Sequence, residues 1–321
     1  MEQKTVDTEK AVYRKMFPQK KSSTKNTRPT KKDFALYRES KPARKQNTGN
    51  VSEVVVNGEH IRPRHFSPYQ CTAYSEDGVV WHCEACLLAF PKNRALALHR
   101  KTCRRDPPGD EIYRTGNLSV FRVDGRIAPR YCRSLCLLGK LFIDHKTLYY
   151  DVTTFLFYVL KTAGDGPSPC IAGYFSRERT SETNNLSCLV VLPTHQNKGY
   201  GFFLISLSYL LTRVGGAVGS PERPLSESGR GGYVSYWTWT VLLYLRGMEE
   251  RGERSFTLQR LSKETGMTKD DIVTALDALG LVRKKKDARG YSLSSDWKQK
   301  YKTKNTKQRL CAQKELLKLY R

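Results

Sequence analysis

The sequence Gln196-Asn197-Lys198-Gly199-Tyr200-Gly201 follows a short apolar run, residues 186–192, that Pro193 brings to an end. A run of this length, bounded by polar residues, predicts a buried strand. Apolar residues then recur with helical spacing on one face, at positions 203, 204, 207, 210 and 211. The stretch is therefore predicted to be a strand, a glycine turn and a helix, as in a mixed α and β fold.

A glycine turn at the start of a helix favours one kind of ligand. Several backbone N–H groups point outward there, and the helix dipole adds positive potential, so the turn can bind a pyrophosphate. Taken alone, a Gly-x-Gly after a strand is compatible with many nucleotide sites and with an ordinary tight turn.

Composition limits the partners. The 321 residues include 56 Lys and Arg against 31 Asp and Glu, a net charge of +25, which predicts contact with a polyanion, with chromatin and RNA as the leading candidates. The sequence contains no apolar stretch of the length a membrane span needs, so we expect a soluble intracellular protein without membrane contact. The nine cysteines are read as metal ligands, core residues and a reactive thiol rather than a disulfide framework.

We divide the chain into five parts. Residues 1–50 are basic and poor in apolar residues, which predicts a disordered arm. Residues 51–106 begin with a strand-like run, Val54 to Val56, before the hairpin turn Asn57-Gly58, and they contain a cysteine-rich segment. Residues 107–246 form the predicted α and β core.

The remaining two parts are basic. Residues 247–300 contain two predicted helices, 258–265 and 269–279, with Thr268 and Asp271 as a capping box, followed by a basic run and a short strand. This order predicts a helix-turn-helix or winged-helix-like unit. Residues 301–321 are a basic tail, and the residues from 297 onward could form a surface helix or fray.

A zinc site is predicted by the pattern Cys83-x2-Cys86-x12-His99-x3-Cys103, which has the ligand spacing of a Cys2HisCys finger. Four protein ligands leave no position for water, so the predicted role is structural. His82 could compete as a ligand, but His99 has the required spacing. A single finger is more often a packing unit than a reader of bases.

The sequence resembles the MYST family of histone acetyltransferases over about residues 51–300. The resemblance is carried by QNKGYG together with other segments in family order: CLLGKLFIDHKTLYYD (136–151), FLFYVL, GYFSRER, GSPERPLSESG (219–229) and YWTW. It implies a GNAT-like acetyltransferase core, with acetyl-CoA against the strand of Cys188. The implied cofactor contacts are Leu189, Val190 and Val191 by their backbone, Gln196, Asn197, Lys198, Gly199, Tyr200, Gly201 and Phe202 at the pyrophosphate, and Ser226 and Ser235 farther along.

The resemblance also assigns chemical roles. Removing a proton from a lysine amine near pH 7 costs about 4–5 kcal/mol, so a base is needed, and Glu222 matches the general base of the family. Cys188 matches a cysteine proposed as a nucleophile, with a core cysteine beside the thioester as the alternative. We favour direct attack of the amine, with the Leu189 N–H donating to the thioester oxygen.

Lys140 matches a lysine that becomes acetylated by the enzyme itself. As a hypothesis, its modification removes a positive charge and helps to order the substrate site, and full activity of Lys140→Arg would count against this. The alternative is an ordinary lysine at the edge of the core.

The predicted function is transfer of acetyl groups to lysines of histone tails in the nucleus. The expected partners are histones, nucleosomes, subunits of an acetyltransferase complex, and DNA contacted nonspecifically by the basic arms. His195, Asn197 and Phe202 depart from the family, which usually has an aromatic residue and two basic residues there, so the phosphate loop has fewer cations. Two alternatives remain: a chromatin or nucleic-acid binding protein with an inactive fold, and an acetyltransferase of other proteins.

Overall fold

The computed structural model describes residues 51–318 except 104–105, 144–149, 164–168, 254, 285–290, 294–296 and 305–308. The predicted disordered arm, residues 1–50, lies outside the described residues. The described residues fall into two compact units, one made of 51–106 and 133–150, the other of 107–132 and 151–318. Helix α4 (Pro129–Lys140) begins in the second unit and continues into the first. In these ranges, no helix has the length and apolar character to cross a membrane.

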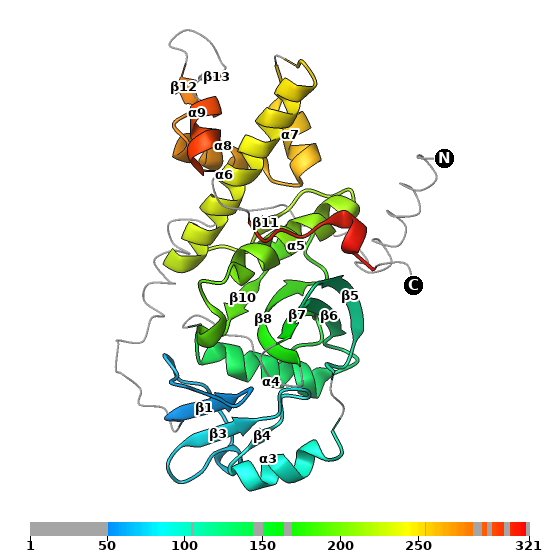
Figure 1. Cartoon of the computed structure of the whole chain (residues 1–321), viewed down its shortest axis with the longest axis vertical. Helices are drawn as coiled ribbons and strands as arrows, with labels where there is room; N and C mark the ends of the chain where they lie inside the picture. The colour runs from blue at the N-terminus through cyan, green and yellow to red at the C-terminus, as the bar shows by residue number, and fades with distance from the viewer. Residues whose placement is uncertain are drawn as a thin grey trace. The chain divides into compact units, whose positions relative to one another are not determined.

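The unit that contains residues 51–106 is built on a small sheet with the strand order β2-β1-β3-β4. As predicted, Asn57 and Gly58 form a tight turn, and their φ angles of 58° and 80° are typical of a two-residue hairpin loop. The elements are β1 (Glu53–Val56), β2 (Glu59–Ile61), the short 3-10 helix η1 (Cys71–Ala73), β3 (Val79–His82), β4 (Ala89–Phe90) and α3 (Asn93–Arg100), shown in Figure 1.

The other unit contains a five-stranded antiparallel sheet in the order β10-β8-β7-β6-β5. Its strands are β5 (Asp110–Thr115), β6 (Leu118–Asp124), β7 (Phe155–Ala163), β8 (Pro169–Glu178) and β10 (Cys188–Val191). A second, two-stranded sheet pairs β9 (Asn184–Leu186) in parallel with β11 (Ser220–Pro221). A 3-10 turn, η2 (Pro193–His195), follows β10.

The apolar run 186–192 is divided between these two sheets. It was predicted as one buried strand, but Leu186 ends β9, and β10 begins at Cys188 and pairs with β8. Among the described strands, β10 is at an edge, and three of its four residues are only partly buried. The spacing of apolar residues predicts which residues are buried but not which strand they pair with. The change of sheet at Ser187 could therefore not be predicted from the sequence.

Helix α5 (Tyr200–Val214) is buried on two sides. Phe203, Leu207 and Leu210 pack against the five-stranded sheet, whereas Ile205 and Tyr209 join a separate helical cluster. Only the first side was predicted. The helix can bury its polar residues because their hydroxyls bond to its own carbonyls, as Ser208 Oγ does to Ile205 O at 2.8 Å.

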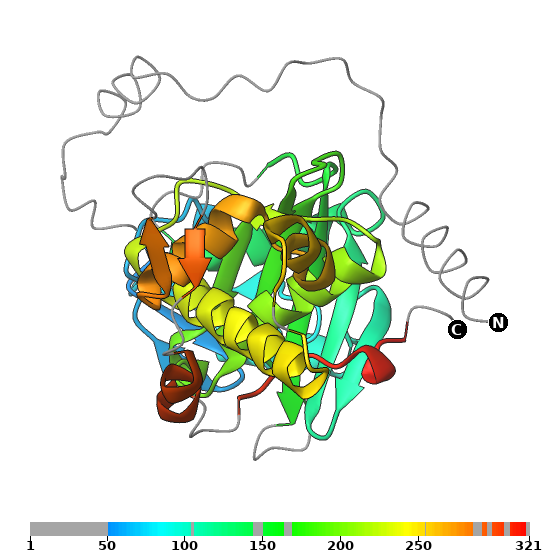
Figure 2. The same ribbon diagram turned by 90° about the horizontal axis from the view of Figure 1, so that it is seen from above.

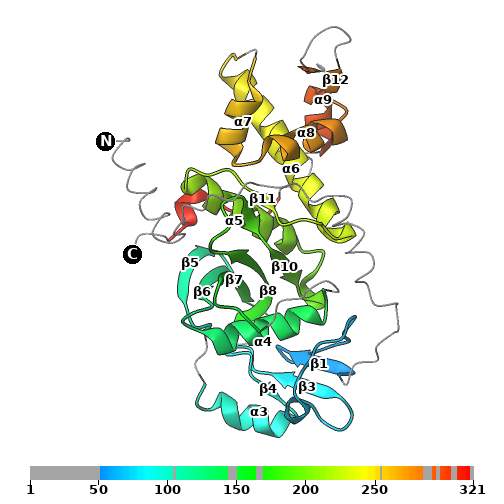
Figure 3. The same ribbon diagram turned by 180° about the vertical axis from the view of Figure 1, so that it is seen from behind.

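The helical cluster consists of α6 (Glu227–Glu250), α7 (Leu258–Thr265) and α8 (Lys269–Ala278), with α5 beside α6 (Figure 3). As predicted, the Thr268 hydroxyl accepts a hydrogen bond from the Asp271 N–H at 3.3 Å and caps α8. Gly266 ends α7 with a φ of 71°, a conformation that glycine adopts readily. Beyond α8 follow β12 (Val282–Lys284), β13 (Tyr291–Leu293) and α9 (Trp297–Lys304).

Residues 309–318, which we call the C-terminal strap, pack against the core of the same unit (Figure 2, red). The N–H of Ala312 donates to Ser206 Oγ at 2.8 Å, and that of Gln313 to the Tyr113 hydroxyl at 3.1 Å. Leu317 forms a β-bridge with Tyr113, after the short 3-10 helix η3 (Lys314–Leu316). The strap is thus a structural part of the fold. Of the two alternatives considered for the residues from 297 onward, the helix forms over α9 (Trp297–Lys304), and neither anticipated the strap.

Candidate functional site

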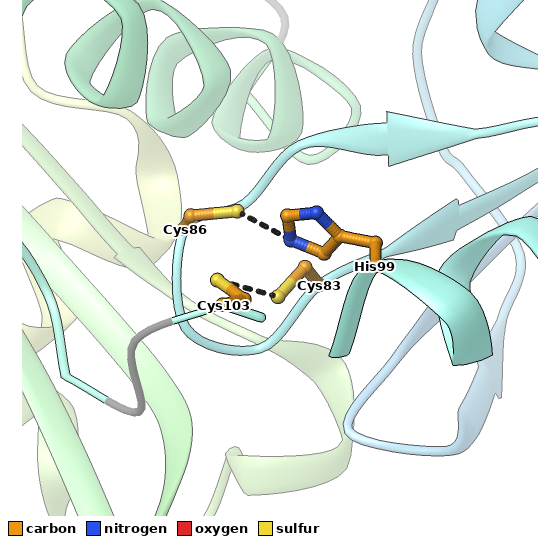
Figure 4. A group of neighbouring side chains, drawn as sticks. All are labelled: Cys83, Cys86, His99 and Cys103. Atoms are coloured by element: carbon orange, nitrogen blue, oxygen red, sulfur yellow. Dashed lines mark hydrogen bonds between the residues drawn. The ribbon is translucent and has the colours of Figure 1, made fainter. Parts of the chain in front are cut away.

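The predicted zinc ligands converge on one point. The sulfur atoms of Cys83, Cys86 and Cys103 and a ring nitrogen of His99 all lie within 4.8 Å of one another (Figure 4). Cys83 Sγ is 3.7 Å from Cys103 Sγ, and Cys86 Sγ is 3.2 Å from His99 Nε2. A tetrahedral zinc ion with Zn–S of about 2.3 Å and Zn–N of about 2.0 Å separates its ligands by roughly 3.5–3.8 Å. The residues therefore fit zinc.

The local backbone explains this arrangement. Cys83 and Cys86 occupy a tight loop closed by hydrogen bonds from Leu87 N to Cys83 O and from Cys83 N to Leu88 O. Leu87 has a φ of 58° and is fully buried, and the small core at the loop is formed by Cys83, Ala85 and Leu96. His99 comes from helix α3. A hydrogen bond between the two thiols lowers the pKa of Cys83 and raises that of Cys86, so without a metal one proton is shared by the pair.

His82 is engaged elsewhere. Its Nδ1 lies 2.9 Å from the Leu87 carbonyl, which can only accept, so Nδ1 carries the proton. Its Nε2 then accepts a hydrogen bond from the Tyr69 hydroxyl at 3.0 Å. Burial lowers the pKa of His82 to about 4, and the ring is neutral near pH 7. Both ring nitrogens are thus used, which supports His99 as the ligand.

Strand β10 offers backbone groups to a ligand along its outer edge. Leu192 N donates to Ala172 O of β8 at 2.9 Å, and antiparallel pairs alternate between bonded and non-bonded residues. By this alternation, the N–H and C=O groups of Leu189 and Val191 point away from β8. Close pairing of the two strands depends on Gly173, because an added Cβ there would lie 2.3 Å from the Val190 carbonyl oxygen.

The glycine turn connects β10 to α5. Asn197 and Gly199 have φ angles of 62° and 84°, a region that suits asparagine and glycine. Gly199 is the N-cap of α5 and has no side chain that could accept from the first N–H groups of the helix, so these remain available to an anion. The Gln196 side chain donates to Val191 O at 3.0 Å and ties the turn to β10.

Glu222 stands beside the start of β10. Its backbone N–H donates to Leu186 O at 2.8 Å, two residues before Cys188. The Glu222 side chain is exposed, whereas Cys188 is half-buried. The neighbouring Arg223 is engaged elsewhere, because its guanidinium contacts Asp271 Oδ1 at 2.7 Å. The carboxylate is therefore open to an incoming amine.

The two predicted cofactor serines have partners within the protein. Ser226 is the N-cap of α6, and its hydroxyl accepts from Gly229 N at 3.1 Å. Its own proton remains free to donate to a ligand. Ser235, on α6, accepts a hydrogen bond from Arg309 of the strap at 2.8 Å. Lys140, the predicted modification site, ends helix α4 and is half-buried.

Two residues near the candidate site had no such contacts predicted from the sequence. Asp271 was noted only as a capping residue, yet its fully buried carboxylate accepts hydrogen bonds from Arg223 and Tyr209. Arg309 was counted only among the charges of the tail. Asp271 and Arg309 each contact a residue far away in the chain, and the sequence position of a charged residue does not predict such a distant partner.

Comparison with known proteins places the chain in a family. The family model described as MOZ/SAS matches residues 106–317. The chain is 43% identical over 232 residues to "Histone acetyltransferase ESA1" of Gibberella zeae, covering 72% of this chain and 46% of that protein. It is 42% identical over 239 residues to "Putative MYST-like histone acetyltransferase 1" of Oryza sativa subsp. japonica, covering 74% and 52%.

The chain belongs to the MOZ/SAS family, which confirms the resemblance found in the sequence. The human "Histone acetyltransferase KAT6B" is likewise 43% identical over 243 residues, or 75% of this chain, although these are 12% of that longer protein. The chain spans about half the length of the Gibberella and rice relatives. The family match extends to residue 317 and includes most of the C-terminal strap.

Proposed function

We propose that this protein is a lysine acetyltransferase that transfers the acetyl group of acetyl-CoA to lysine side chains of histone tails. The observation that carries the proposal is the exposed carboxylate of Glu222, whose backbone is bonded to Leu186 beside the open edge of β10. The names of the relatives, which describe histone acetyltransferases, support the same activity.

The division of the chain follows from this proposal. The five-stranded sheet with α5 corresponds to a GNAT-like core within residues 107–246, and residues 247–300 to a winged-helix-like part. Residues 51–106 carry the finger, with zinc in a structural role. We further propose a nuclear location, nucleosomes and complex subunits as partners, and nonspecific contact of the basic segments with DNA, which the net charge of +25 supports.

Acetyl-CoA would supply an acetyl group activated as a thioester. The residues present fit its shape: the outward N–H and C=O of Leu189 and the N–H of Val191 match the amides of an extended pantetheine arm, and the N-terminus of α5 suits the pyrophosphate. The Leu189 N–H would donate to the thioester oxygen as charge develops. Water is displaced from the edge of β10 when the arm lies along it.

The acid–base chemistry falls to Glu222. A substrate lysine has a reference pKa of about 10.4 and arrives protonated. Glu222 accepts that proton, and because its side chain is exposed the proton can pass on to solvent. The free amine would then attack the thioester carbonyl directly; as the amide C–N bond forms the C–S bond breaks, and CoA would leave as a thiolate that takes up the second proton of the amine. Cys188, half-buried on β10, lines this place, and a covalent role for its thiol is the alternative.

The test is acetyl transfer from labelled acetyl-CoA to core histones by the wild type, by Glu222→Gln and by the matched control Glu250→Gln. Glu250 is an exposed glutamate at the far end of α6. We expect transfer by the wild type and the control, a fall of roughly 100-fold or more in Glu222→Gln near pH 7, and partial recovery at high pH, where free amine is abundant.

The outcomes separate the candidates. Equal transfer by all three proteins would exclude Glu222 as the base. Absence of transfer by folded, zinc-loaded wild type, even with nucleosomes and nuclear extract added, would favour a binding protein with an inactive fold. Transfer to other lysine-rich proteins in preference to histones would identify a different substrate class.

A further inference from the structure

The predicted pyrophosphate turn is poor in positive charge. Among residues 196–202 the only basic residue is Lys198, and its side chain is exposed. Position 202, where the resemblance implies a basic residue, is occupied by Phe202, which packs edge-on against Tyr236 and Trp239. A pyrophosphate and a 3′-phosphate carry several negative charges, so this turn needs compensation from elsewhere.

Arg309 of the C-terminal strap lies at this place. Its guanidinium carbon is 4.8 Å from the centre of the Phe202 ring, and its Nη1 donates to Ser235 Oγ at 2.8 Å. The next strap residue, Leu310, lies beside the turn: a Cβ added at Gly199 would be 3.7 Å from the Leu310 Cβ. Arg309 therefore sits beside Phe202 and Ser235, two of the positions implied to contact acetyl-CoA.

The charge of Arg309 is not balanced within the described part of the chain. No carboxylate there forms an ion pair with it, and its guanidinium contacts the hydroxyl of Ser235 and the ring of Phe202. Guanidinium has five N–H donors, and the bond to Ser235 uses one of them. A half-buried cation with donors to spare, next to an uncapped helix N-terminus, suits a phosphate oxygen.

The strap also holds Arg309 in position. Ala312 is buried and bonded to Ser206, and Gln313 is bonded to Tyr113, so the backbone just beyond Arg309 is fixed. The Phe202 ring supports one face of the guanidinium by a cation–π contact. The Arg309 side chain is therefore already ordered without the ligand. Binding then loses less conformational entropy, which favours affinity.

We propose that Arg309 binds a phosphate of acetyl-CoA and supplies, from the C-terminal strap, the positive charge that the turn lacks at position 202. This inference rests on the proposed function, because it concerns the same cofactor site. It assigns the strap a direct part in cofactor binding in addition to its part in the core.

The experiment is calorimetric titration of the full-length protein with CoA and with 3′-dephospho-CoA. The proteins are the wild type, Arg309→Gln, Arg309→Lys, the double variant Phe202→Lys/Arg309→Gln, and Lys318→Gln. Lys318→Gln is the matched control, because it removes a strap charge that pairs with Glu111 at the other end of the strap. Thermal unfolding of each variant shows whether the fold is retained.

For CoA, we expect Arg309→Gln to weaken binding roughly tenfold, the factor that corresponds to 1.4 kcal/mol, and to reduce the dependence of affinity on salt. Arg309→Lys and the double variant should recover part of the affinity, and Lys318→Gln should bind like the wild type. A tenfold loss that persists with 3′-dephospho-CoA assigns Arg309 to the pyrophosphate, and a loss that disappears assigns it to the 3′-phosphate.

Two results would overturn the inference. One is unchanged affinity of a folded Arg309→Gln protein. The other is equal weakening by Lys318→Gln, which would mean that the strap as a whole, and not the charge of Arg309, matters. If the wild type itself does not bind CoA, it is the proposed function that fails, and the two failures are thereby distinguished.

Discussion

The guanidinium of Arg223 lies 2.7 Å from the carboxylate of Asp271, a residue 48 positions later in the chain. The pair joins the segment that carries Glu222 to helix α8. Asp271 is fully buried, whereas the Arg223 side chain is 55% exposed. The Arg223 guanidinium also lies over the Trp237 ring, at 5.8 Å from its centre. The two partners thus differ in burial, and removing one or the other should change the stability of the fold by different amounts.

We predict that Arg223→Ala destabilises the fold more than Asp271→Asn. Loss of the arginine leaves a buried carboxylate without its cation, at a cost of about 1–3 kcal/mol. Loss of the carboxylate leaves an arginine that already reaches water, and asparagine retains an acceptor oxygen. Urea denaturation of both variants at pH 7 measures the two costs, and an equal or reversed order would contradict the asymmetry.

The same pair predicts a pH dependence. Burial raises the pKa of Asp271 above its usual value, and the hydrogen bonds and the Arg223 charge only partly offset this. Because the pKa of Asp271 is higher in the folded state than in the unfolded state, protonated Asp271 favours the folded state. This contribution to stability is complete below the unfolded pKa of about 3.8 and is lost as the pH rises through the folded pKa. Without Arg223 the pKa rises further, so the deficit of Arg223→Ala should be larger at pH 7 than at pH 4 in parallel denaturation curves.

Gly173→Ala should separate β10 from β8. The new Cβ would lie 2.3 Å from the Val190 carbonyl oxygen, so one strand must move. We expect a loss of stability of about 1–3 kcal/mol, as for overpacking, and weaker binding of CoA along the displaced strand. Gly231→Ala is the control, because an added Cβ at Gly231 has no atom within 4 Å. Similar behaviour of the two variants in denaturation and titration would speak against this role of Gly173.

Cys188→Ala should retain transfer within about tenfold of the wild type if the amine attacks directly, since only one contact beside the thioester is lost. Glu222→Gln should be far more damaging. Steady-state kinetics with histone peptide compare the variants, and intact-protein mass spectrometry after mixing with acetyl-CoA alone detects acetyl on the protein. A Cys188-dependent acetyl adduct together with an inactive Cys188→Ala protein would favour the covalent route instead.

The metal content of two histidine variants should differ. His99→Ala is expected to lose zinc because a ligand is removed, whereas His82→Gln should keep about one zinc per chain. His82→Gln should still unfold at a lower temperature, because the buried bonds to Tyr69 and Leu87 are disturbed. Elemental analysis of the purified proteins decides the matter, and zinc loss in His82→Gln alone would reverse the ligand assignment.

The parts that followed from the sequence are those fixed by local spacing. The hairpin at Asn57-Gly58, the helix 258–265 and the convergence of Cys83, Cys86, His99 and Cys103 depend on residues near one another in the chain. Turn propensity, capping and ligand spacing depend on residues close together in the chain, so they can be predicted from the sequence alone. The glycine turn before α5 was predictable for the same reason.

The missed features depend on distant partners. Tyr113 bonds to the strap residue Gln313, 200 positions away, and the switch of sheets at Ser187 depends on where β8 and β11 lie. The second buried side of α5 appears only once α6 has packed against it. The strap was predicted as part of a basic tail because its two short apolar runs, 310–312 and 316–317, follow a long basic segment and show no helical or strand period.

The strap has a consequence for how the protein is made. Tyr113 and Phe203 emerge from the ribosome long before Ala312, yet all three belong to one core. A nascent chain cannot complete that core until the strap has left the exit tunnel. Until then, the part of the sheet and of α5 that the strap covers remains exposed to solvent. Protection by chaperones should therefore matter most during this interval, and a recombinant fragment that stops before residue 309 would keep the same surface open permanently.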